Sequence, residues 1–240
     1  MRLNVTIPVL NEEVMLPDTV RTLNARLMAD YPDGDWVIVV SDNASTDGTP
    51  RIVKAMLPEF SNLRYVRLEK LGKGYGVRSG WEAYPADVNV FMDADLATDL
   101  GALKPLVEAV AHHGGVAIGS RYHPASKVQR SLFRMLVSRG YRFVFRLWLG
   151  LRVRDAACGF KAVSRQVLSS VVPEVQDNRW FFDTELLVRA QRAGYQIMEV
   201  PVLWSDEAPG SRRSRVKVTT VARQYLVACE RLRRELNDSL

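Results

Sequence analysis

Two aspartates spaced two residues apart, Asp93 and Asp95, have the clearest potential for chemistry in this chain. They directly follow the apolar, β-rich segment VNVFM, and two carboxylates at the end of a strand can turn toward one hard divalent cation. Mg²⁺ or Mn²⁺ held in this way usually completes its shell with phosphate oxygens of a substrate. The pattern therefore predicts a metal site, with two unrelated surface aspartates as the alternative.

Two more polar clusters follow earlier apolar segments. The sequence PVLNE at 8–12 comes after one β-rich run, and DNASTDGT at 42–49 comes after DWVIVVS. Downstream, KLGKGYGVR at 70–78 interleaves three glycines with bases, although it matches neither the P-loop nor the dinucleotide-binding spacing. Glycines let backbone N–H groups approach an anion, and the N-terminus of a following helix adds its dipole. This segment predicts phosphate binding, with a plain surface loop as the alternative.

The segments around these clusters alternate between strand and helix patterns. Alternation of this kind predicts βαβ units and a mostly parallel sheet, whose ligands bind beyond the carboxyl ends of the strands. No repeat or linker interrupts the pattern, so we expect one α/β domain over residues 1–240. We expect strands at 3–7, 35–41, 63–68, 88–92, 115–120 and 197–203, and helices at 13–29, 47–56, 76–83, 180–193 and 216–236.

The positive charge is concentrated in two blocks. The chain carries 33 Lys and Arg against 27 Asp and Glu, for a net charge of +6, and residues 120–165 alone hold 11 basic side chains and 1 acidic one. Arginines alternate there with Phe, Leu and Trp, and a helix over 131–149 would align Arg139, Arg142 and Arg146 on one face. We therefore expect a basic amphipathic segment at about 130–152 that lies in a membrane interface, and a basic helix at about 216–236. Solvated helix faces are the alternative for both.

The sequence also bears on a nucleic-acid partner and on the cellular compartment. The basic pI suggests nucleic acid, but no helix-turn-helix, RRM or zinc pattern is present, so we expect no nucleic-acid partner. Two cysteines, Cys158 and Cys229, make no disulfide framework, and the start MRLNVTIPVLNEE lacks the features of a signal peptide. These features favour a reducing, cytoplasmic setting. Cys158 fits a small buried packing residue better than a nucleophile.

The motifs form an ordered set along the chain: IPVLNE, SDNASTDGT, KGYG, MDADLAT, GSRY, RDAACGFK, FFDTELL and VPVLW. Together they resemble the family 2 glycosyltransferases of GT-A fold, the nucleotide-diphospho-sugar transferase fold. Within that family they resemble the enzymes that transfer mannose or glucose to dolichyl or other polyprenyl phosphates. The resemblance runs from Val5 to about Arg213.

The resemblance implies roles for particular residues on the donor side. Pro8, Leu10, Glu12 and Asp42 would cradle the nucleoside, Asp93 and Asp95 would hold Mg²⁺ or Mn²⁺ at the diphosphate with Ala94 beside them, and Lys73 or Arg212 would stabilise the departing nucleoside diphosphate. Two positions depart from the family pattern. Asn43 stands where many relatives have a second Asp, so base or ribose recognition is assigned to Asp42 alone. Ala97 replaces a Gln that supplies a further metal ligand in many mannose enzymes.

The implied acceptor is a lipid phosphate. Arg121, Arg134 and Ser138 match the phosphate-binding positions of the family, and Arg suits phosphate through its forked donors. Because a phosphate monoester is already anionic, it needs no strong general base, and direct displacement with inversion is expected. Asp183 and Glu185 are then assigned to positioning of donor sugar or acceptor, with Asp183 counted among the catalytic residues.

The donor sugar follows from two motifs. RDAACGFK and RWFFDTELL are more similar to the glucose enzymes than to the mannose enzymes, so UDP-glucose is the first expectation and GDP-mannose the second. A soluble hydroxyl acceptor is a further alternative, and it would need Asp183 as a base. On the lipid-phosphate reading, the protein acts while peripherally attached to the cytoplasmic face of a membrane. The sequence leaves the oligomeric state and a separate membrane subunit open.

Overall fold

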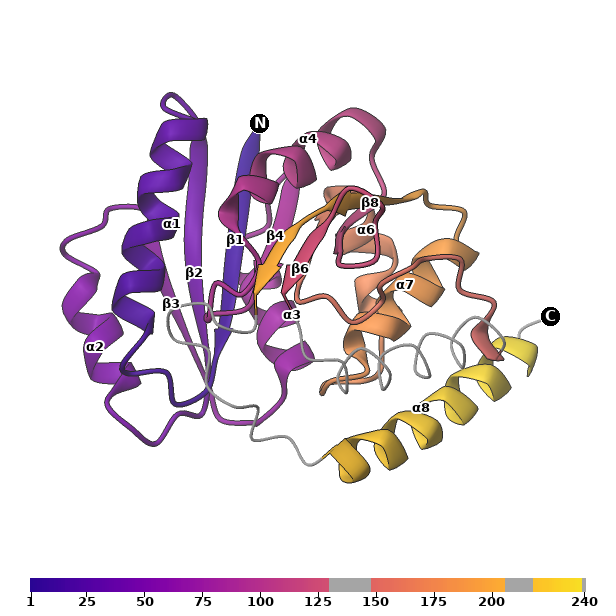
Figure 1. The fold of residues 1–240 in the computed structure, drawn as a ribbon. Coiled ribbons are helices and arrows are strands. Elements are labelled where there is room, and N and C mark those ends of the chain that lie inside the picture. Colours follow the sequence, from indigo (N-terminus) through magenta and orange to yellow (C-terminus); the bar gives the residue numbers. More distant parts are fainter. Residues whose placement is uncertain (130–147, 206–217, 239–240) are drawn as a thin grey trace.

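The strands consist of short runs of apolar and β-branched residues. Such runs suit a central sheet that is covered on both faces, where side chains on both sides of a strand are buried. The computed structural model describes residues 1–129, 148–205 and 218–238. Its seven-stranded sheet has helices on both faces, and its strands follow the order β3-β2-β1-β4-β7-β5-β8 (Figure 1).

All neighbouring strands in this sheet are parallel except at β7, which runs antiparallel to both β4 and β5. The mostly parallel sheet expected from the sequence is therefore present. Its strands are β1 (Arg2–Val9), β2 (Asp35–Asn43), β3 (Leu63–Leu68), β4 (Val88–Met92), β5 (Val116–Ser120), β7 (Phe160–Ser164) and β8 (Ile197–Pro201). Two short strands, β6 (Lys127–Gln129) and β9 (Leu203–Ser205), pair in a second sheet.

The helices cover both faces of the large sheet. They are α1 (Leu16–Asp30), α2 (Thr49–Met56), α3 (Lys73–Ala83), α4 (Leu103–His113), α6 (Arg165–Ser170), α7 (Phe182–Arg192) and α8 (Val218–Asp238), with short 3₁₀ turns η1 (Leu100–Ala102) and η2 (Val172–Glu174). Strands β6 and β7 and helices α4 and α6 are additions to the elements expected from the sequence, and the strand expected at 197–203 is divided into β8 and β9.

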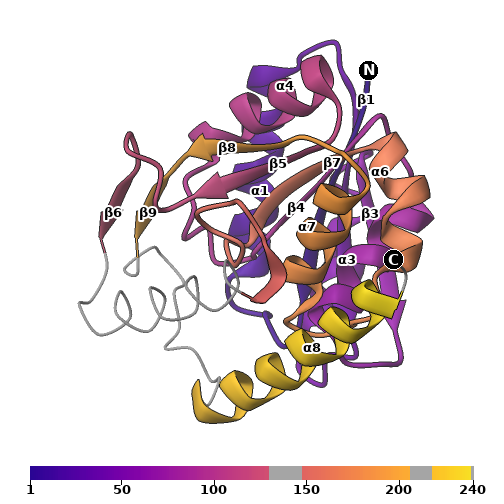
Figure 2. The ribbon, with the colours of Figure 1, turned by 90° about the vertical axis from the view of Figure 1, so that its right-hand side faces the viewer.

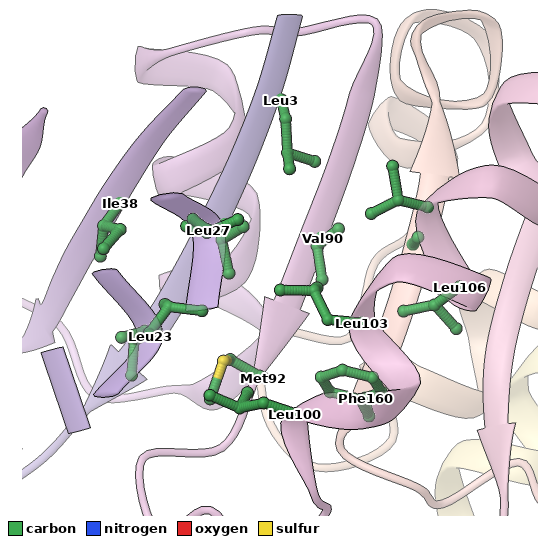
Figure 3. Packing of buried hydrophobic residues seen from close by; sticks show 14 of the residues in the cluster. Leu3, Leu23, Leu27, Ile38, Val90, Met92, Leu100, Leu103, Leu106 and Phe160 are labelled. Carbon is green, nitrogen blue, oxygen red and sulfur yellow. The ribbon is translucent and has the colours of Figure 1, made fainter. Parts of the chain in front are cut away.

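The core consists of two apolar clusters, one on each face of the sheet. Because successive strand residues point to opposite faces, Val90 and Met92 pack with α1, α2 and α4 on one face, while Phe91 packs with α3, α6, α7 and α8 on the other. Figure 3 shows part of the first cluster, where leucines of α1 and α4 lie over β1 and β4. This packing makes the sheet a rigid support for the loops at the ends of its strands.

Helix α8 crosses the molecule near the edge at which β1, β2 and β4 end (Figures 1 and 2). It buries Ala228, Cys229 and Leu232 in the second cluster, while Leu226 and Val227 remain exposed. Within the described residues, none of the helices has the length and apolar character that crossing a bilayer requires.

Candidate active site

The two aspartates of the D-x-D motif line a cavity at the carboxyl end of β4. The cavity has a volume of about 100 Å³. Its walls are Met92, Asp93, Asp95, Ala97, Thr98, Arg121, Ala157, Gly159, Phe160 and Trp204. The structure thus brings three of the expected site residues, Asp93, Asp95 and Arg121, to one hollow.

The carboxylate of Asp95 lies in an unfavourable setting for a charge. Burial, and then the neighbouring Asp93 carboxylate, raise the pKa of Asp95 above its ordinary value. A backbone hydrogen bond from Ala97 N to its Oδ1 at 3.0 Å and the charge of Lys73 oppose the shift. The next residue, Leu96, has a left-handed φ of 52°, which a leucine adopts only under constraint from its surroundings. A nearby cation would therefore stabilise the charged form of Asp95.

Gly159 forms the floor beneath Asp93. A methyl group at Gly159 would stand 1.8 Å from Asp93 Oδ2, and the Gly159 carbonyl accepts a hydrogen bond from Asp93 N at 3.1 Å. Only glycine permits this close approach. The residue is therefore a part of the site that the sequence analysis did not single out, although it belongs to the quoted motif RDAACGFK.

Lys73 and Asp183 meet Asp93 from the helical side. Lys73 begins α3 and places its Nζ 2.7 Å from Asp93 Oδ1 and 3.9 Å from Asp183 Oδ2. Burial alone would lower the pKa of Lys73, but the Asp93 and Asp183 carboxylates raise it above its ordinary value. On the other side, Asp183 Oδ1 accepts a hydrogen bond at 2.7 Å from Lys161, a fully buried lysine of β7. Lys161 is a second residue that sequence reasoning missed.

Arg121 is bound to an aspartate of the protein. Its Nε and Nη2 donate to the two carboxylate oxygens of Asp155 at 2.7 and 2.8 Å, and its backbone N–H donates to Oδ2 at 2.9 Å. Burial would raise the pKa of Asp155, but the Arg121 charge outweighs it and the pKa lies below its ordinary value. The pair fixes the guanidinium at the cavity wall, with its Cζ over the Trp204 ring at 5.6 Å from the ring centroid.

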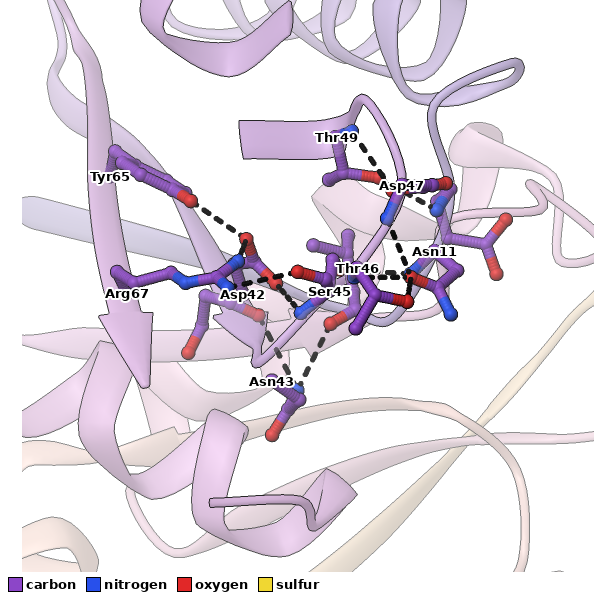
Figure 4. A network of polar contacts seen from close by, with 12 residues as sticks. Asn11, Asp42, Asn43, Ser45, Thr46, Asp47, Thr49, Tyr65 and Arg67 are labelled. Atoms are coloured by element: carbon purple, nitrogen blue, oxygen red, sulfur yellow. Dashed lines mark hydrogen bonds and ion pairs between the residues drawn. The ribbon is translucent and has the colours of Figure 1, made fainter. Parts of the chain in front are cut away.

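The expected nucleoside-binding residues lie around the ends of β1 and β2, where a dense polar network joins the two loops (Figure 4). Asp42 is fully buried and accepts from Ser45 N at 2.8 Å, Tyr65 Oη at 2.7 Å and Arg67 Nη1 at 2.5 Å. Burial would raise the pKa of Asp42, yet these hydrogen bonds lower it below its ordinary value. Both of its carboxylate oxygens are thus engaged within the protein.

The remaining residues of this group lie on the loop after β1. Pro8 is half-buried within β1, Leu10 is exposed, and Glu12 is half-buried with its N–H donating to Thr49 Oγ1 at 2.9 Å. Between them Asn11, at a φ of 58°, accepts hydrogen bonds from Thr46 N and Asp47 N. The two loops are therefore locked together before any ligand arrives.

The glycine-rich segment packs closely against a neighbouring part of the chain. Helix α3 already begins at Lys73, and the N–H groups of Gly74 and Tyr75 donate to the carbonyls of Arg179 and Asn178. The glycines serve close packing, since a methyl at Gly74 would stand 2.4 Å from Phe182 Cβ. Two of the N–H groups that could meet a phosphate are therefore engaged within the protein, since glycine permits the close approach of any group. Of the bases in this segment, Lys73 is the one that reaches Asp93.

Glu185 also turns away from the cavity. It is fully buried and binds Arg189 at 2.7 Å and Arg231 of α8 at 2.7 Å, while the N–H groups of Gln176 and Asp177 donate to its two oxygens. Asp183 and Glu185 are two residues apart on α7 and so point in different directions. The positioning role expected for Glu185 is replaced by attachment of α8.

Several expected site residues lie outside the described part of the chain. These are Arg134 and Ser138 with the helix expected over 131–149, and Arg212 with its neighbour Arg213. Cys158 is a buried thiol whose pKa is raised to about 11, foremost by burial, which agrees with a packing role.

The donor set at β4 fits a hard divalent cation that is shared with a phosphate ligand. Asp93 and Asp95 offer carboxylate oxygens, which suit Mg²⁺ and Mn²⁺, and a lysine ammonium already stands at one of them. Over residues 1–129, 148–205 and 218–238 there is no cluster of three or more His, Cys, Asp or Glu side chains that could hold a metal. A cation here would therefore need further ligands, which a diphosphate or water supplies.

Known proteins are similar to this chain over most of its length. The model of a family described as Glycosyl transferase family 2 matches residues 4–172. The chain is 37% identical over 209 residues to Glycosyltransferase AglD of Haloferax volcanii, an alignment that covers 86% of this chain and 34% of that protein. It is 30% identical over 238 residues to the dolichyl-phosphate beta-glucosyltransferase of Saccharomyces cerevisiae, covering 88% of this chain and 68% of that one. The chain thus spans about a third of the first relative and about two thirds of the second.

Among solved structures, glucosyl-3-phosphoglycerate synthase of Mycobacterium tuberculosis, in complex with Mn²⁺, UDP and glucosyl-3-phosphoglycerate, superposes with a TM-score of 0.70. The sequences are 22% identical, and the alignment covers 96% of this chain and 79% of that chain. This likeness concerns the fold, and it confirms the fold class expected from the motifs.

Proposed function

We propose, from the premise that this chain belongs to glycosyl transferase family 2, that it transfers a hexose from a nucleotide diphosphate sugar to a polyprenyl phosphate, with inversion at the anomeric carbon. The observation that carries the proposal is the cavity at the end of β4, where Asp93, Asp95 and Arg121 converge. It combines a carboxylate pair suited to a metal diphosphate with an arginine suited to a second phosphate.

The donor side is divided between two clusters. Asp93 and Asp95 would hold Mg²⁺ or Mn²⁺, which when bound neutralises the diphosphate and favours its departure. The nucleoside would lie toward the ends of β1 and β2, beside Pro8, Leu10 and Glu12. Because both Asp42 oxygens are engaged, Asp42 would act there by holding Tyr65 and Arg67 in place. Strand β1 separates β2 from β4, so the two clusters lie roughly 10 Å apart by strand spacing, within the span of a nucleoside diphosphate.

We favour UDP-glucose as donor because of the relatives named as dolichyl-phosphate beta-glucosyltransferases. GDP-mannose is the second candidate. For the acceptor, Arg121 would attract the lipid phosphate, together with Arg134 and Ser138, which lie outside the described residues. A phosphate oxygen is already a nucleophile at neutral pH, so the protein needs to position it in line with the anomeric carbon. Lys73, with Arg212, would stabilise the charge of the departing diphosphate, and Asp183 would orient Lys73.

Attachment to a membrane surface would follow from the acceptor. Leu226 and Val227 are 48% and 66% exposed on α8. Trp180 is 43% exposed, and its carbonyl accepts a hydrogen bond from the hydroxyl of Tyr225, which also lies on α8. Exposed apolar and aromatic side chains, in a chain whose sequence also has two basic blocks, fit an interface with anionic lipid. Flotation with vesicles tests this part, and loss of flotation in a Leu226→Asp, Val227→Asp double variant is the expected result.

The decisive experiment is a donor panel. Purified protein is incubated with polyprenyl phosphate, Mn²⁺ or Mg²⁺, and UDP-glucose, UDP-galactose, GDP-mannose or UDP-N-acetylglucosamine, and lipid-linked sugar is measured. We expect turnover with UDP-glucose above all, and a kcat lowered by about 10²- to 10³-fold in Asp95→Asn. Asp87→Asn is the matched control, because Asp87 lies directly before β4, at the end of this strand opposite to Asp95. There its carboxylate accepts a hydrogen bond from the Arg2 N–H at 2.8 Å. Transfer to 3-phosphoglycerate or a free sugar, with none to the lipid, would replace the acceptor proposed here.

A further inference from the structure

The ammonium of Lys73 occupies the place where a cation would be needed. Its Nζ lies 2.7 Å from Asp93 Oδ1, and the faces of the Phe91 and Trp180 rings lie 5.3 and 5.6 Å away. The Lys73 side chain is 13% exposed and the Asp93 side chain is 46% exposed, so water screens this ion pair in part. One of the two D-x-D carboxylates is therefore already neutralised by the protein itself.

The Asp183 carboxylate is a second anion near the Lys73 ammonium. Asp183 Oδ2 lies 3.9 Å from Lys73 Nζ, within reach of a small change in the lysine rotamer. Asp183 cannot follow Lys73 toward Asp93, because its Oδ1 is held at 2.7 Å by Lys161, which also donates to the Cys158 carbonyl. Lys161 is fully buried on β7. Its ion pair with Asp183 offsets the cost of burying its charge and fixes the position of this carboxylate.

The two cations exclude each other at Asp93. A divalent ion coordinated by Asp93 and Asp95 would repel an ammonium left at Asp93 Oδ1, because the two cations would share one carboxylate. Lys73 must then withdraw, and Asp183 Oδ2 is the carboxylate beside it. A diphosphate reverses the balance, since its own negative charge attracts both the metal ion and the displaced ammonium.

We propose that Lys73 is a positioning residue that neutralises Asp93 in the ligand-free site and passes to Asp183 when metal and nucleotide bind together. The consequence is that the metal binds weakly by itself and tightly with the diphosphate. The inference rests on the metal site of the proposed function and adds the order in which that site is filled.

Manganese titration of the full chain tests it without any turnover. Free Mn²⁺ is followed by electron paramagnetic resonance for the wild type, Lys73→Met, Asp183→Asn and the control Lys70→Met, each with and without UDP. Lys70 is exposed three residues before Lys73. Without UDP, we expect Lys73→Met to bind Mn²⁺ at least tenfold more tightly than the wild type. Asp183→Asn should bind several-fold more weakly, since Lys73 then keeps to Asp93, and Lys70→Met should equal the wild type. UDP should strengthen Mn²⁺ binding less in Lys73→Met than in the wild type.

The outcomes separate this inference from the proposed function. If the wild type binds Mn²⁺ with UDP but Lys73→Met alone binds it no more tightly than the wild type, Lys73 does not compete with the metal and the inference is overturned. If no variant binds Mn²⁺ even with UDP, the metal site itself fails, and the inference with it. Thermal melting checks the fold of each variant. Should Lys73→Met not fold, Asp183→Asn decides, since equal or tighter Mn²⁺ binding in that variant contradicts the second position of Lys73.

Discussion

The ends of β2 and β4 lie at the same edge of the sheet, yet their aspartates are in opposite states. Asp42 at β2 is buried among three donors that lower its pKa, whereas the pKa of Asp95 beyond β4 is raised by burial and by Asp93. The first cluster is complete as folded and holds two loops in a fixed shape. The second lacks positive charge, which Lys73 supplies only in part. The difference teaches that an acidic strand end indicates a ligand site where its carboxylates remain unsatisfied, and a structural support where they do not.

The largest effect should come from Asp95→Asn. Removing one carboxylate of the pair should lower kcat by about 10²- to 10³-fold, because charge stabilisation of the leaving diphosphate is lost. The thermal stability of the ligand-free variant, in contrast, should not fall. A carboxyl whose folded pKa lies above its ordinary value destabilises the ligand-free fold as pH rises past that ordinary value, so the melting temperature at pH 7 should match or exceed that of the wild type. A large fall in melting temperature would show that Asp95 is structural.

Gly159→Ala tests how closely Asp93 must be held. The added methyl would stand 1.8 Å from Asp93 Oδ2 and would force the carboxylate aside. We expect kcat to fall by about 10²-fold, the effect of a displacement near 1 Å at a reacting centre. Gly48→Ala is the comparison in the β2 cluster, where the methyl meets the flexible end of Glu13 at 2.5 Å and activity should change little. Equal losses in the two variants would remove the distinction between the clusters.

Asp42→Asn should act mainly on stability. Loss of the buried charge leaves Arg67 and Tyr65 with a weaker acceptor, and the free energy of unfolding at pH 7 should fall by about 2 kcal/mol. Because the folded pKa of Asp42 is lowered, its contribution is present above its ordinary pKa and is lost as pH falls through the folded value. Urea unfolding at pH 7 and pH 3 should show the variant's deficit shrinking in acid. The KM for the donor should rise several-fold, with a smaller change in kcat. Asp18→Asn, at an exposed α1 position, is the control.

Glu185→Gln should have the smallest effect on chemistry. The variant weakens the ion pairs to Arg189 and Arg231 that fasten α8, so the melting temperature should fall by a few degrees while kcat changes less than about threefold. Limited proteolysis should cut α8 faster than in the wild type. A loss of kcat as large as that of Gly159→Ala would return Glu185 to the catalytic site.

The sequence was most informative where a single strand decides the geometry. Alternation predicted the parallel strands and placed the D-x-D pair at the end of β4. Strand β7 was missed because FKAVS is short and its antiparallel partners in β4 and β5 are far away in the chain, so no local pattern marks it. Lys161 and Gly159 were missed for the same reason, since their roles depend on what lies across the sheet.

The sequence did not show which side chains pair with one another in the folded protein. Nothing local pairs Arg121 with Asp155, which lies 34 residues further along the chain. The spacing of Asp183 and Glu185 did contain the needed signal, because residues two apart on a helix do not share a face. For the glycines before and within α3, the sequence indicated a close approach but not the approaching group, which proved to be Phe182 and the carbonyls of 178–179.

The central claim is that the end of β4 is a cation site and the end of β2 is not. The most direct measurement is the melting temperature of the wild type, Asp95→Asn and Asp42→Asn with UDP alone and with UDP plus Mn²⁺. Ligands that bind the folded state raise its stability by mass action. We expect an additional rise with Mn²⁺ in the wild type and in Asp42→Asn, and none in Asp95→Asn. An equal Mn²⁺-dependent rise in Asp95→Asn would contradict it.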